Sequence, residues 1–352
     1  MLIWSKLLMD WYSAVKRDLP WRKSKDPYRV WLSEVILQQT RVAQGMPYYE
    51  TFVSHYPDVQ ALAAAPEQAV LRDWQGLGYY SRARNLHQAA KQVVQAHGGE
   101  FPASYQALLA LKGVGPYTAA AISSIAFNLP QAVVDGNVYR VLSRMFGVRE
   151  AIDQPTGQKI FAQLADKLLD REEPGTYNQA LMEFGALQCV PVNPDCENCL
   201  FNADCVAFKE GTVRLLPVKA GKVKVRKRFF NYVVIRFEDG LYLQQRQAGD
   251  IWQHLWDFTN FEADRELNEI EISTHFQQKF SFSEMDFRVI AHSEPAKHVL
   301  THQRIFAKFW LVQIFHNLQN KELKFVPINH LDTYPLPRLI DLTIKKNKEW
   351  LD

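Results

Sequence analysis

Two carboxylic acids lie in sequence surroundings that would separate their pKa values. Glu34 is the only acid in a helical pattern over residues 28–40, and most of its neighbours three and four residues away are apolar. Loss of solvation on such a face raises the pKa of a carboxyl group and equips it to donate a proton near neutral pH. Asp135 precedes another helical pattern, and a helix N-terminus lowers the pKa of an acid. An aspartate held ionised in this way could stabilise a positively charged sugar during glycoside hydrolysis.

Each of these acids also has an ordinary structural explanation. Ser33 and Glu34 could form a narrow solvent-facing strip of the helix, and the pattern by itself favours that interpretation. Asp135 could be a helix N-cap, as most acids at such positions are. The capping and chemical roles of Asp135 are compatible with each other.

The four cysteines of the chain lie within seventeen residues and follow the spacing C-x6-C-x2-C-x5-C. In a reducing compartment such a cluster indicates a metal site more often than two disulfides. Four thiolates suit either zinc or an iron–sulfur cluster, and spacing alone leaves both open. The predicted metal ligands are Cys189, Cys196, Cys199 and Cys205.

A glycine turn joins two further helical patterns, with Gly113, Val114 and Gly115 followed by Pro116 at the predicted start of a helix. The next residues, 117–127, are rich in small side chains and could pack closely against another element. A turn that exposes backbone N–H groups before a helix is a ready anion site, and phosphate is the obvious anion. For this motif taken alone, an ordinary pair of helices joined by glycines is the favoured interpretation.

Length and composition predict a two-domain globular protein. The 352 residues are 47% hydrophobic and 22% charged, with a formal net charge of +3. This charge permits nucleic-acid binding where positive residues cluster, and it excludes a strongly polyanionic protein. No apolar run reaches the length of a membrane span and no signal peptide is recognised, so we expect a cytoplasmic protein.

The period of the hydrophobic pattern changes from helical to strand-like near the middle of the chain. Residues 1–208 are predicted to form an all-helical domain, and 209–228 a basic linker that could follow phosphates or be a solvated tether. Residues 229–352 are predicted to form a mixed domain, with a hairpin around Glu238-Asp239-Gly240 and a final helix over 338–351. In the first domain, the glycine- and tyrosine-rich segment 74–80 suits DNA contact and base wedging, or a buried aromatic turn.

These motifs jointly resemble one family. The segments LPWR, SEVILQQTR, GLGYYSRARNL, GVGPYTAAAI, VDGNV and NQALMEFGA and the cysteine loop are similar to those of the adenine DNA glycosylases of the MutY type. The resemblance implies a multidomain fold, with an all-α helix-hairpin-helix domain that carries a 4Fe–4S cluster on the cysteine loop. It also implies an α+β Nudix-like C-terminal domain. That domain lacks a Nudix box, so lesion recognition is predicted there and not pyrophosphate hydrolysis.

The family excises adenine opposite 8-oxoguanine from double-stranded DNA, and the resemblance carries its catalytic roles onto matching residues. Glu34 would protonate adenine N7, and Asp135 would stabilise the sugar cation or add to it covalently. Tyr117 and Asn137 would position these groups. Because Tyr117 stands where bifunctional relatives carry a Schiff-base lysine, the resemblance implies a monofunctional enzyme that acts as a monomer.

The resemblance also implies DNA-binding and base-pocket residues. The base pocket would be lined by Arg22, Gln179 and Glu183. The lesion-reading loop departs from the family's F-S-H sequence, because the corresponding residue before Thr301 is Leu300, which lacks an aromatic face. The predicted DNA-binding residues are Gln39, Thr40, Leu77, Tyr79, Gly113, Val114, Gly115, Thr301 and His302.

Three alternatives remain at this point. The chain could be an endonuclease III-like glycosylase for oxidised pyrimidines, or a DNA-binding scaffold that has lost its chemistry. Zinc could also take the place of the iron–sulfur cluster.

Overall fold

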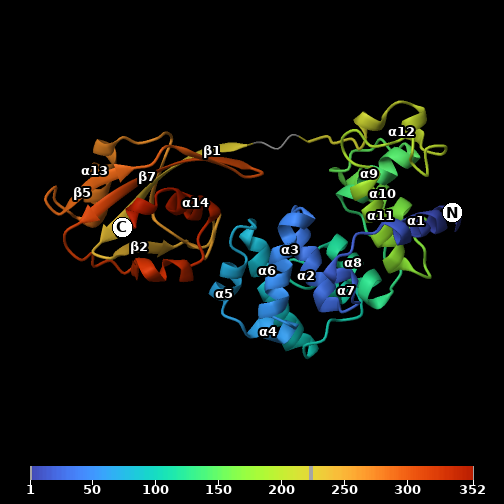
Figure 1. Ribbon diagram of the computed structural model, residues 1–352, viewed down its shortest axis with the longest axis horizontal. Coiled ribbons are helices and arrows are strands. Elements are labelled where there is room, and N and C mark those ends of the chain that lie inside the picture. The colour runs from blue at the N-terminus through green and yellow to red at the C-terminus, as the bar shows by residue number, and fades with distance from the viewer. Residues whose placement is uncertain (1, 222–224, 352) are drawn as a thin grey trace. The chain divides into compact units, whose positions relative to one another are not determined.

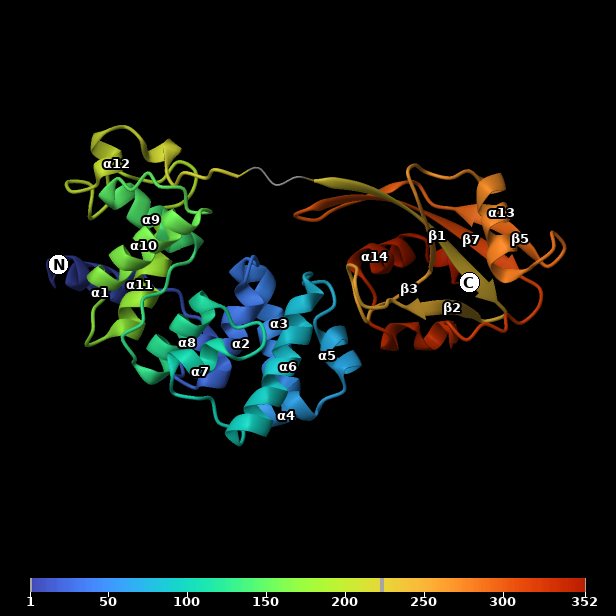
Figure 2. The same cartoon turned by 180° about the vertical axis from the view of Figure 1, so that it is seen from behind.

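The computed structural model describes residues 2–221 and 225–351 and divides them into two compact units. Unit 1 comprises residues 2–64 and 85–221, and unit 2 comprises residues 65–84 and 225–351. Figure 1 shows the helices of unit 1 and the sheet of unit 2, and Figure 2 shows the same elements from behind. The predicted fold class, an all-helical part followed by a mixed α and β part, is confirmed.

Unit 1 is built from short helices joined by tight turns. One of them, α6, begins in unit 2 and continues into unit 1. The helices of residues 2–215 are α1 (Leu2–Val15), η1 (Pro20–Arg22), α2 (Pro27–Leu37), α3 (Val42–His55), α4 (Val59–Ala64), α5 (Glu67–Asp73, unit 2), α6 (Tyr80–His97), α7 (Tyr105–Leu109), α8 (Pro116–Phe127), α9 (Gly136–Phe146), α10 (Pro155–Leu168), α11 (Pro174–Leu187), α12 (Val206–Lys209) and η2 (Val213–Leu215).

The two helix starts predicted at Pro116 and after Asp135 are confirmed. The Asp26 side chain caps α2 by accepting a hydrogen bond from the Tyr28 N–H (3.0 Å), ahead of the first-turn proline. Asp135 caps α9 in the same way. The helix around Glu34 ends at Leu37, three residues earlier than predicted, so Gln39 and Thr40 lie in the following loop.

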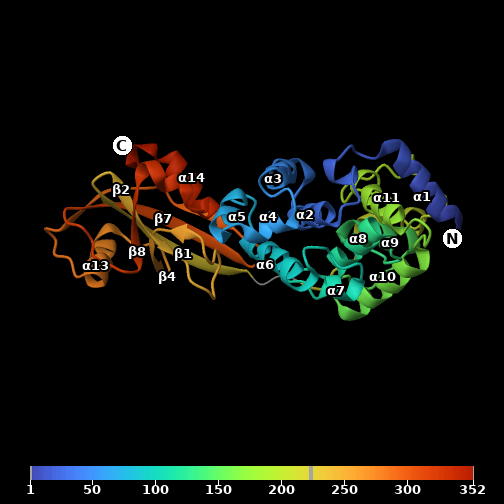
Figure 3. The ribbon, with the colours of Figure 1, turned by 90° about the horizontal axis from the view of Figure 1, so that it is seen from below.

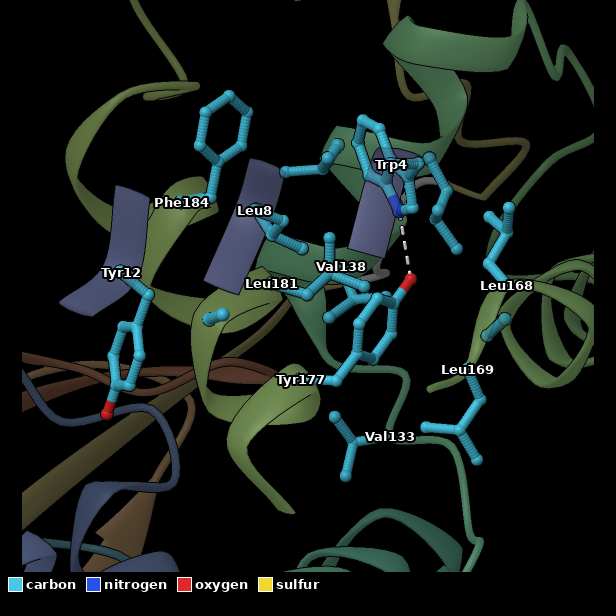
Figure 4. Packing of buried hydrophobic residues seen from close by; sticks show 14 of the residues in the cluster. Trp4, Leu8, Tyr12, Val133, Val138, Leu168, Leu169, Tyr177, Leu181 and Phe184 are labelled. Atoms are coloured by element: carbon cyan, nitrogen blue, oxygen red, sulfur yellow. Dashed lines mark hydrogen bonds between the residues drawn. The ribbon is translucent and has the colours of Figure 1, made fainter. Parts of the chain in front are cut away.

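A hydrophobic core of unit 1 fixes α1 against the helices that carry the site residues. The Trp4 indole N–H donates to the Tyr177 hydroxyl (3.0 Å), and Figure 4 shows Leu8, Val138 and Leu181 packed beside this pair. Because α1 and α11 share this core with α9, burial of these side chains determines where the start of α9 lies.

Two glycines of α11 allow close helix packing at the site. A Cβ atom added to Gly175 would lie 2.6 Å from the backbone oxygen of Ser124, on the small-residue helix α8. One added to Gly185 would lie 2.6 Å from the Cβ of Asn137, at the start of α9. The close packing expected of the small-residue helix is therefore confirmed, and any larger side chain at these glycines would displace α8 or α9.

Unit 2 contains a mixed sheet whose central pair, β1 and β7, is parallel. Strands β3, β2, β1, β7 and β5 follow one another across it, while β4 pairs with β1, β6 with β7 and β8 with β2. The described strands are β1 (Arg226–Phe237), β2 (Gly240–Gln245), β3 (Trp256–Asp257), β4 (Thr259–Ala263), β5 (Phe287–His292), β6 (Ala296–Val299), β7 (Gln303–Ile314) and β8 (Leu323–Pro327).

Helices cover the two faces of this sheet. Figure 3 shows α13 (Glu269–Phe280) and α14 (Arg338–Lys346) on opposite sides. Apolar side chains of α13 pack against β1 and β7, with Phe276 fully buried. The 3₁₀ turns η3 (Ile328–Thr333) and η4 (Lys348–Trp350) flank α14. The β1–β2 hairpin and the final helix were predicted, although this helix ends at Lys346 and not at residue 351. The sequence did not indicate α13 or the short strands β3, β4, β6 and β8.

The predicted linker is in part bound to unit 1. The Asp153 carboxylate accepts hydrogen bonds from the N–H groups of Ala220 (2.9 Å) and Gly221 (2.8 Å). Strand β1 then begins at Arg226, inside the predicted linker. The predicted linker lysines Lys222 and Lys224 lie outside the described residues. Among the helices of the described residues, none is long and apolar enough to cross a membrane.

Candidate functional site

A cleft in unit 1, with a volume of about 420 Å³, gathers the predicted catalytic and base-pocket residues. Glu34 comes from α2, Tyr117 from α8, and Asp135 and Asn137 from the start of α9. The other predicted residues that line this cleft are Arg22, Thr40, Gln179 and Glu183. Side chains that lie about a hundred residues apart in the chain therefore share one cavity.

Glu34 is partly buried in this cleft beside a buried Ser33, whose hydroxyl donates to the Val30 carbonyl (2.8 Å). The solvent-facing interpretation of this helix face is therefore wrong, because the cleft and α8 cover it. Burial raises the pKa of Glu34 to about 7, a hydrogen bond donated by the Tyr117 hydroxyl opposes the rise, and the Asp135 charge adds to it. The carboxyl group is thus poised to give up or take a proton near neutral pH.

Asp135 lies at the N-terminus of α9 as predicted. Its Oδ1 accepts hydrogen bonds from the N–H groups of Asn137 (2.9 Å) and Val138 (2.7 Å), and its Oδ2 accepts one from the Asn137 side-chain amide (2.8 Å). The predicted lowering of its pKa is wrong in direction, since burial raises the pKa of Asp135 and these hydrogen bonds only oppose the rise. Three donors nevertheless hold the carboxylate in a single orientation.

Tyr117 is hydrogen-bonded to Glu34 in the cleft. Its hydroxyl donates to Glu34 and also lies 3.4 Å from the Met182 sulfur. Burial and the neighbouring Glu34 charge raise the pKa of Tyr117 well above its usual value. The phenol therefore stays protonated and acts as a donor, not as a nucleophile.

Glu183 is almost fully buried and is held by two arginines. Arg22 Nη1 and Nη2 donate to its two carboxylate oxygens (3.0 and 2.8 Å), and Arg17 Nε donates to Oε1 (2.8 Å). Burial would raise the pKa of Glu183, but these hydrogen bonds outweigh it and lower the pKa to about 2. Gln179, in the same wall, accepts a hydrogen bond from the Tyr12 hydroxyl (3.2 Å). Sequence reasoning did not identify Arg17, because nothing local marks a partner 166 residues away.

The glycine turn lies outside this cleft. Gly113 has a positive φ of 75°, and a Cβ atom there would lie 2.6 Å from the Cβ of Asn85. The Val114 N–H donates to the Leu111 carbonyl (3.1 Å), and the Val114 side chain is buried. Gly115 is the N-cap of α8. Of the three predicted phosphate-binding amides, the one of Val114 is therefore already used inside the turn.

The remaining predicted DNA-binding residues fall into two groups. Gln39, with a positive φ of 54°, and Thr40 follow α2. Leu77 is buried, whereas Tyr79 is 44% exposed and has a positive φ of 50°. Positive φ at side chains such as Gln39 and Tyr79 is uncommon and marks backbone constrained by its surroundings.

Tyr79 contacts the predicted lesion-reading loop within unit 2. Its hydroxyl lies 2.8 Å from the Thr301 hydroxyl. The loop is a tight turn between β6 and β7, closed by a hydrogen bond from the Leu300 N–H to the Gln303 carbonyl (2.8 Å), and it leaves Thr301 and His302 exposed. A recess of about 420 Å³ in unit 2 is lined by Tyr79, Tyr80, Ser81, Arg84, residues 249–252 and residues 300–303.

The four cysteines surround one apolar hollow and are unpaired. Within residues 2–221 and 225–351, no three His, Cys, Asp or Glu side chains are grouped closely enough to hold a single metal ion. Two arginines of α9 bind this loop: Arg140 Nε donates to the Cys189 carbonyl (2.7 Å), and Arg144 Nη1 lies 3.5 Å from the Cys189 sulfur. The loop is thus tied to the helix whose first turn holds Asp135.

Comparison with known proteins shows matches in both parts of the chain. Residues 32–168 match the model of the HhH-GPD superfamily base excision DNA repair proteins, and residues 231–346 match the model of the NUDIX domain. The adenine DNA glycosylase of Buchnera aphidicola subsp. Baizongia pistaciae (strain Bp) is 30% identical over 356 residues, which cover 99% of this chain and 98% of that protein.

Two further matches cover mainly the helical part. The adenine DNA glycosylase of Rattus norvegicus is 44% identical over 225 residues, covering 60% of this chain and 43% of that protein. The solved structure of a thermostable thymine-DNA glycosylase is similar with a TM-score of 0.55 and 30% identity, over 59% of this chain and 96% of that chain.

Proposed function

The chain belongs to the adenine DNA glycosylase family, and from that premise we propose that it removes adenine from duplex DNA by hydrolysing the N-glycosidic bond. This is the first step of base excision repair, and the substrate would be adenine opposite 8-oxoguanine. The observation that carries the proposal is the pairing of Glu34 and Asp135 in one cleft, one acid with a pKa of about 7 and the other held by a helix N-terminus.

Glu34 would act as the general acid. With a pKa of about 7, half of the Glu34 side chains carry a proton near neutral pH and can pass it to adenine N7. Protonation makes the base a better leaving group, because the electron pair of the breaking C–N bond then flows into a cationic ring. The Tyr117 hydroxyl would keep the carboxyl group in place during this step.

Asp135 would stabilise the cationic sugar that bond cleavage leaves behind. A carboxylate held by three hydrogen bonds needs little reorganisation when positive charge develops next to it. Its oxygen could either remain beside the cation or bond to the anomeric carbon, until water replaces it and completes the hydrolysis. Asn137 is the positioning residue, because its backbone and side chain both donate to Asp135.

The enzyme would be monofunctional. Imine-based strand cleavage needs a neutral amine beside the sugar, and among the described residues the cleft contains arginines but no lysine. Tyr117 occupies the matching place with a phenol whose raised pKa keeps it protonated. Every described residue of the cleft comes from unit 1, so the chemistry needs no second copy of the chain.

The base pocket would recognise adenine chiefly through Arg22 and Gln179. The two oxygens of Glu183 already accept five hydrogen bonds from Arg17 and Arg22, which exceeds the roughly four lone-pair sites of a carboxylate. We therefore assign Glu183 to fixing the guanidinium of Arg22 at the pocket wall, in place of direct base contact.

The cysteine loop would hold a 4Fe–4S cluster through the thiolates of Cys189, Cys196, Cys199 and Cys205. A single tetrahedral zinc with Zn–S bonds of about 2.3 Å needs sulfurs within roughly 4 Å of one another, and the described cysteines form no such group. An apolar hollow bordered by four thiols, with Arg144 beside Cys189, suits an anionic iron–sulfur cluster. Bound there, it would stabilise the loop that Arg140 and Arg144 tie to α9. Iron and sulfide in equal amounts are expected in the purified protein, whereas zinc would contradict this assignment.

DNA contacts would come from the glycine turn and from the recess of unit 2. Gly113 and Gly115 offer backbone amides to a phosphate, while Gln39 and Thr40 flank the site where the flipped adenosine enters. Tyr79 would wedge at the lesion, and Thr301 and His302 would contact the base opposite adenine. The exposed Tyr79 and the Tyr79–Thr301 contact support this role.

Single-turnover release of adenine from a duplex with adenine opposite 8-oxoguanine tests the proposal. Wild type should release the base, and Asp135→Asn should not. Equal release by both proteins would remove Asp135 from the mechanism. Activity confined to oxidised pyrimidines would instead identify an endonuclease III-like enzyme, and damage-specific binding without turnover would identify a scaffold.

A further inference from the structure

One wall of the recess in unit 2 is a turn with an unusual backbone. Gly249, Trp252 and His254 all have positive φ, at 99°, 61° and 66°. For residues other than glycine this conformation costs roughly 1–3 kcal/mol each, and it persists only where the surroundings impose it. Trp252 is nevertheless 92% buried, with its ring 5.7 Å from that of His298 on β6. Something other than local preference must therefore hold this turn beside the 300–303 loop.

Arg84 restrains the far end of the turn by donating to the Gln253 carbonyl (2.7 Å), and a buried arginine on β1 restrains its start. Arg228 is only 7% exposed, and its guanidinium donates twice to Asp250 in the turn (both 2.7 Å). It donates twice to Glu262 on β4 (2.7 and 2.6 Å) and once to the Gln303 side chain at the start of β7 (3.2 Å). These five bonds use all five N–H donors of an arginine. One side chain thus joins the strained turn, a neighbouring strand and the base of the exposed loop.

A second arginine completes the arrangement. Arg246 donates to Asp250 Oδ2 (2.8 Å) and to the Ile251 carbonyl (3.0 Å), and it also binds the buried Asp257 (2.8 Å). Asp250 therefore lies between two guanidinium groups at the edge of the recess that it lines. We call Arg228, Arg246, Asp250 and Glu262 the Arg228 cluster.

A cluster of this kind is poorly explained as a source of stability. The arginine side chains are only 7% and 12% exposed, whereas those of Asp250 and Glu262 are 37% and 35% exposed. Removing the two guanidinium charges from water costs about as much as their ion pairs return, and such pairs are often replaceable by apolar residues without loss of stability. Their best-supported contribution is to select one arrangement among several. Here that arrangement brings together the turn with Trp252 and the loop with Thr301.

We propose that the Arg228 cluster sets the shape of the recess, and that Arg228 is a positioning residue for discrimination of the base opposite adenine. This inference rests on the proposed role of the recess in lesion reading. The chemical class discriminated is a purine base, guanine or its 8-oxo derivative, and the selectivity would come from the spacing between the Trp252 turn and the Thr301 loop. Without the hydrogen bonds of Arg228, Gln303 and the turn that contains Trp252 would shift relative to each other. A shift of about 1 Å is enough to weaken strongly the contacts between the recess and a bound base.

The experiment compares single-turnover adenine release from duplexes with adenine opposite 8-oxoguanine and adenine opposite guanine. Arg228→Met removes the charge and retains a side chain of similar length. Arg228→Lys retains the charge but cannot donate two parallel hydrogen bonds to a carboxylate. Asp250→Asn removes the carboxylate to which both arginines of the Arg228 cluster donate. Arg265→Met is the matched control, since Arg265 forms an exposed bidentate pair with Glu271 (3.0 and 2.5 Å) in the same unit, outside the recess.

The expected result is a roughly tenfold loss of the preference for 8-oxoguanine in Arg228→Met and Asp250→Asn, with a smaller loss in Arg228→Lys. The rate on adenine opposite guanine and the Arg265→Met control should match wild type. A parallel fall on both duplexes, or an unchanged preference in a variant that melts like wild type, would overturn the proposal. Should Arg228→Met fail to fold, Asp250→Asn decides, because it leaves Arg228 its Glu262 partner.

A Thr301→Ala variant separates this inference from the function on which it rests. Suppose that wild type prefers 8-oxoguanine, that Thr301→Ala loses this preference and that the Arg228 variants keep it. In that case only the positioning role of Arg228 is wrong. When wild type itself shows no preference, lesion reading by the recess fails and the positioning role fails with it.

Discussion

The cleft of unit 1 and the recess of unit 2 have about the same volume, 420 Å³, but the two predicted catalytic acids of the cleft and Asp250 of the recess have pKa values shifted in opposite directions. In the cleft, burial raises the pKa of both Glu34 and Asp135, and the hydrogen bonds they receive only oppose the rise. In the recess, burial would raise the pKa of Asp250, but the two arginines of the Arg228 cluster outweigh it and hold the pKa below its usual value. A raised pKa suits Glu34 for proton transfer, whereas an ion cluster whose arginines hold Asp250 ionised suits a surface of fixed shape.

The largest expected effect follows from removing the charge of Asp135. Asp135→Asn keeps the shape of the N-cap but loses the negative charge beside the sugar, so single-turnover adenine release should fall roughly 10³-fold. Asp153→Asn is the matched control, because that aspartate also accepts two backbone N–H bonds in unit 1 but lies outside the cleft. A loss of similar size in both variants would show that capping, and not chemistry, explains the effect.

The next largest effect is a pH dependence of the single-turnover rate, caused by the titration of Glu34 in the cleft. Since the pKa of Glu34 is raised to about 7, the protonated acid predominates below that pH and is lost above it. The single-turnover rate should therefore be level below pH 7 and fall about tenfold per pH unit above it. Glu34→Gln should be slow and should lack this descending limb. A limb that persists in Glu34→Gln would assign the proton to another group.

A smaller effect, on stability, is expected from breaking the ion pairs between Glu183 and two arginines of the cleft. Arg17→Ala removes the two hydrogen bonds that the Arg17 side chain donates to buried Glu183, and leaves that anion to Arg22 and one backbone amide. The cost should be about 1–3 kcal/mol of unfolding free energy, measured by urea denaturation. Arg171→Ala, which breaks the exposed pair with Asp166 (3.0 Å), should change stability by less than about 1 kcal/mol. Equal effects would mean that burial of Glu183 does not matter.

The smallest effect should come from Thr301 in the recess. Thr301→Ser keeps the hydroxyl that contacts Tyr79 and should leave the preference for 8-oxoguanine intact. Thr301→Ala removes it and should weaken binding of the lesion duplex by about 1 kcal/mol, or roughly fivefold, in a titration at fixed salt. Loss of preference in Thr301→Ser would indicate that the methyl group, not the hydroxyl, contacts the lesion.

Local patterns predicted most elements that carry the site. Helical periodicity located α2, α8 and α9, and the acid before α9 marked its N-cap, because capping depends on neighbours two and three residues away. The sequence did not predict the short strand β6, the two-residue strand β3 or the helix α13, because their hydrophobic patterns are too short or too irregular to be recognised.

The sequence by itself determined which groups are available: a lone acid in an apolar helix, a capping aspartate, a tyrosine in place of a lysine, and four clustered cysteines. Only the tertiary structure decided what those groups can do. Whether Glu34 faces water or a cleft depends on the helices packed around it, and the pKa of Asp135 follows burial more than the helix N-terminus. The ion pairs of Arg17 and of the Arg228 cluster could not be predicted from the sequence. Desolvation and long-range ion pairing arise only when segments that are distant in the chain come together.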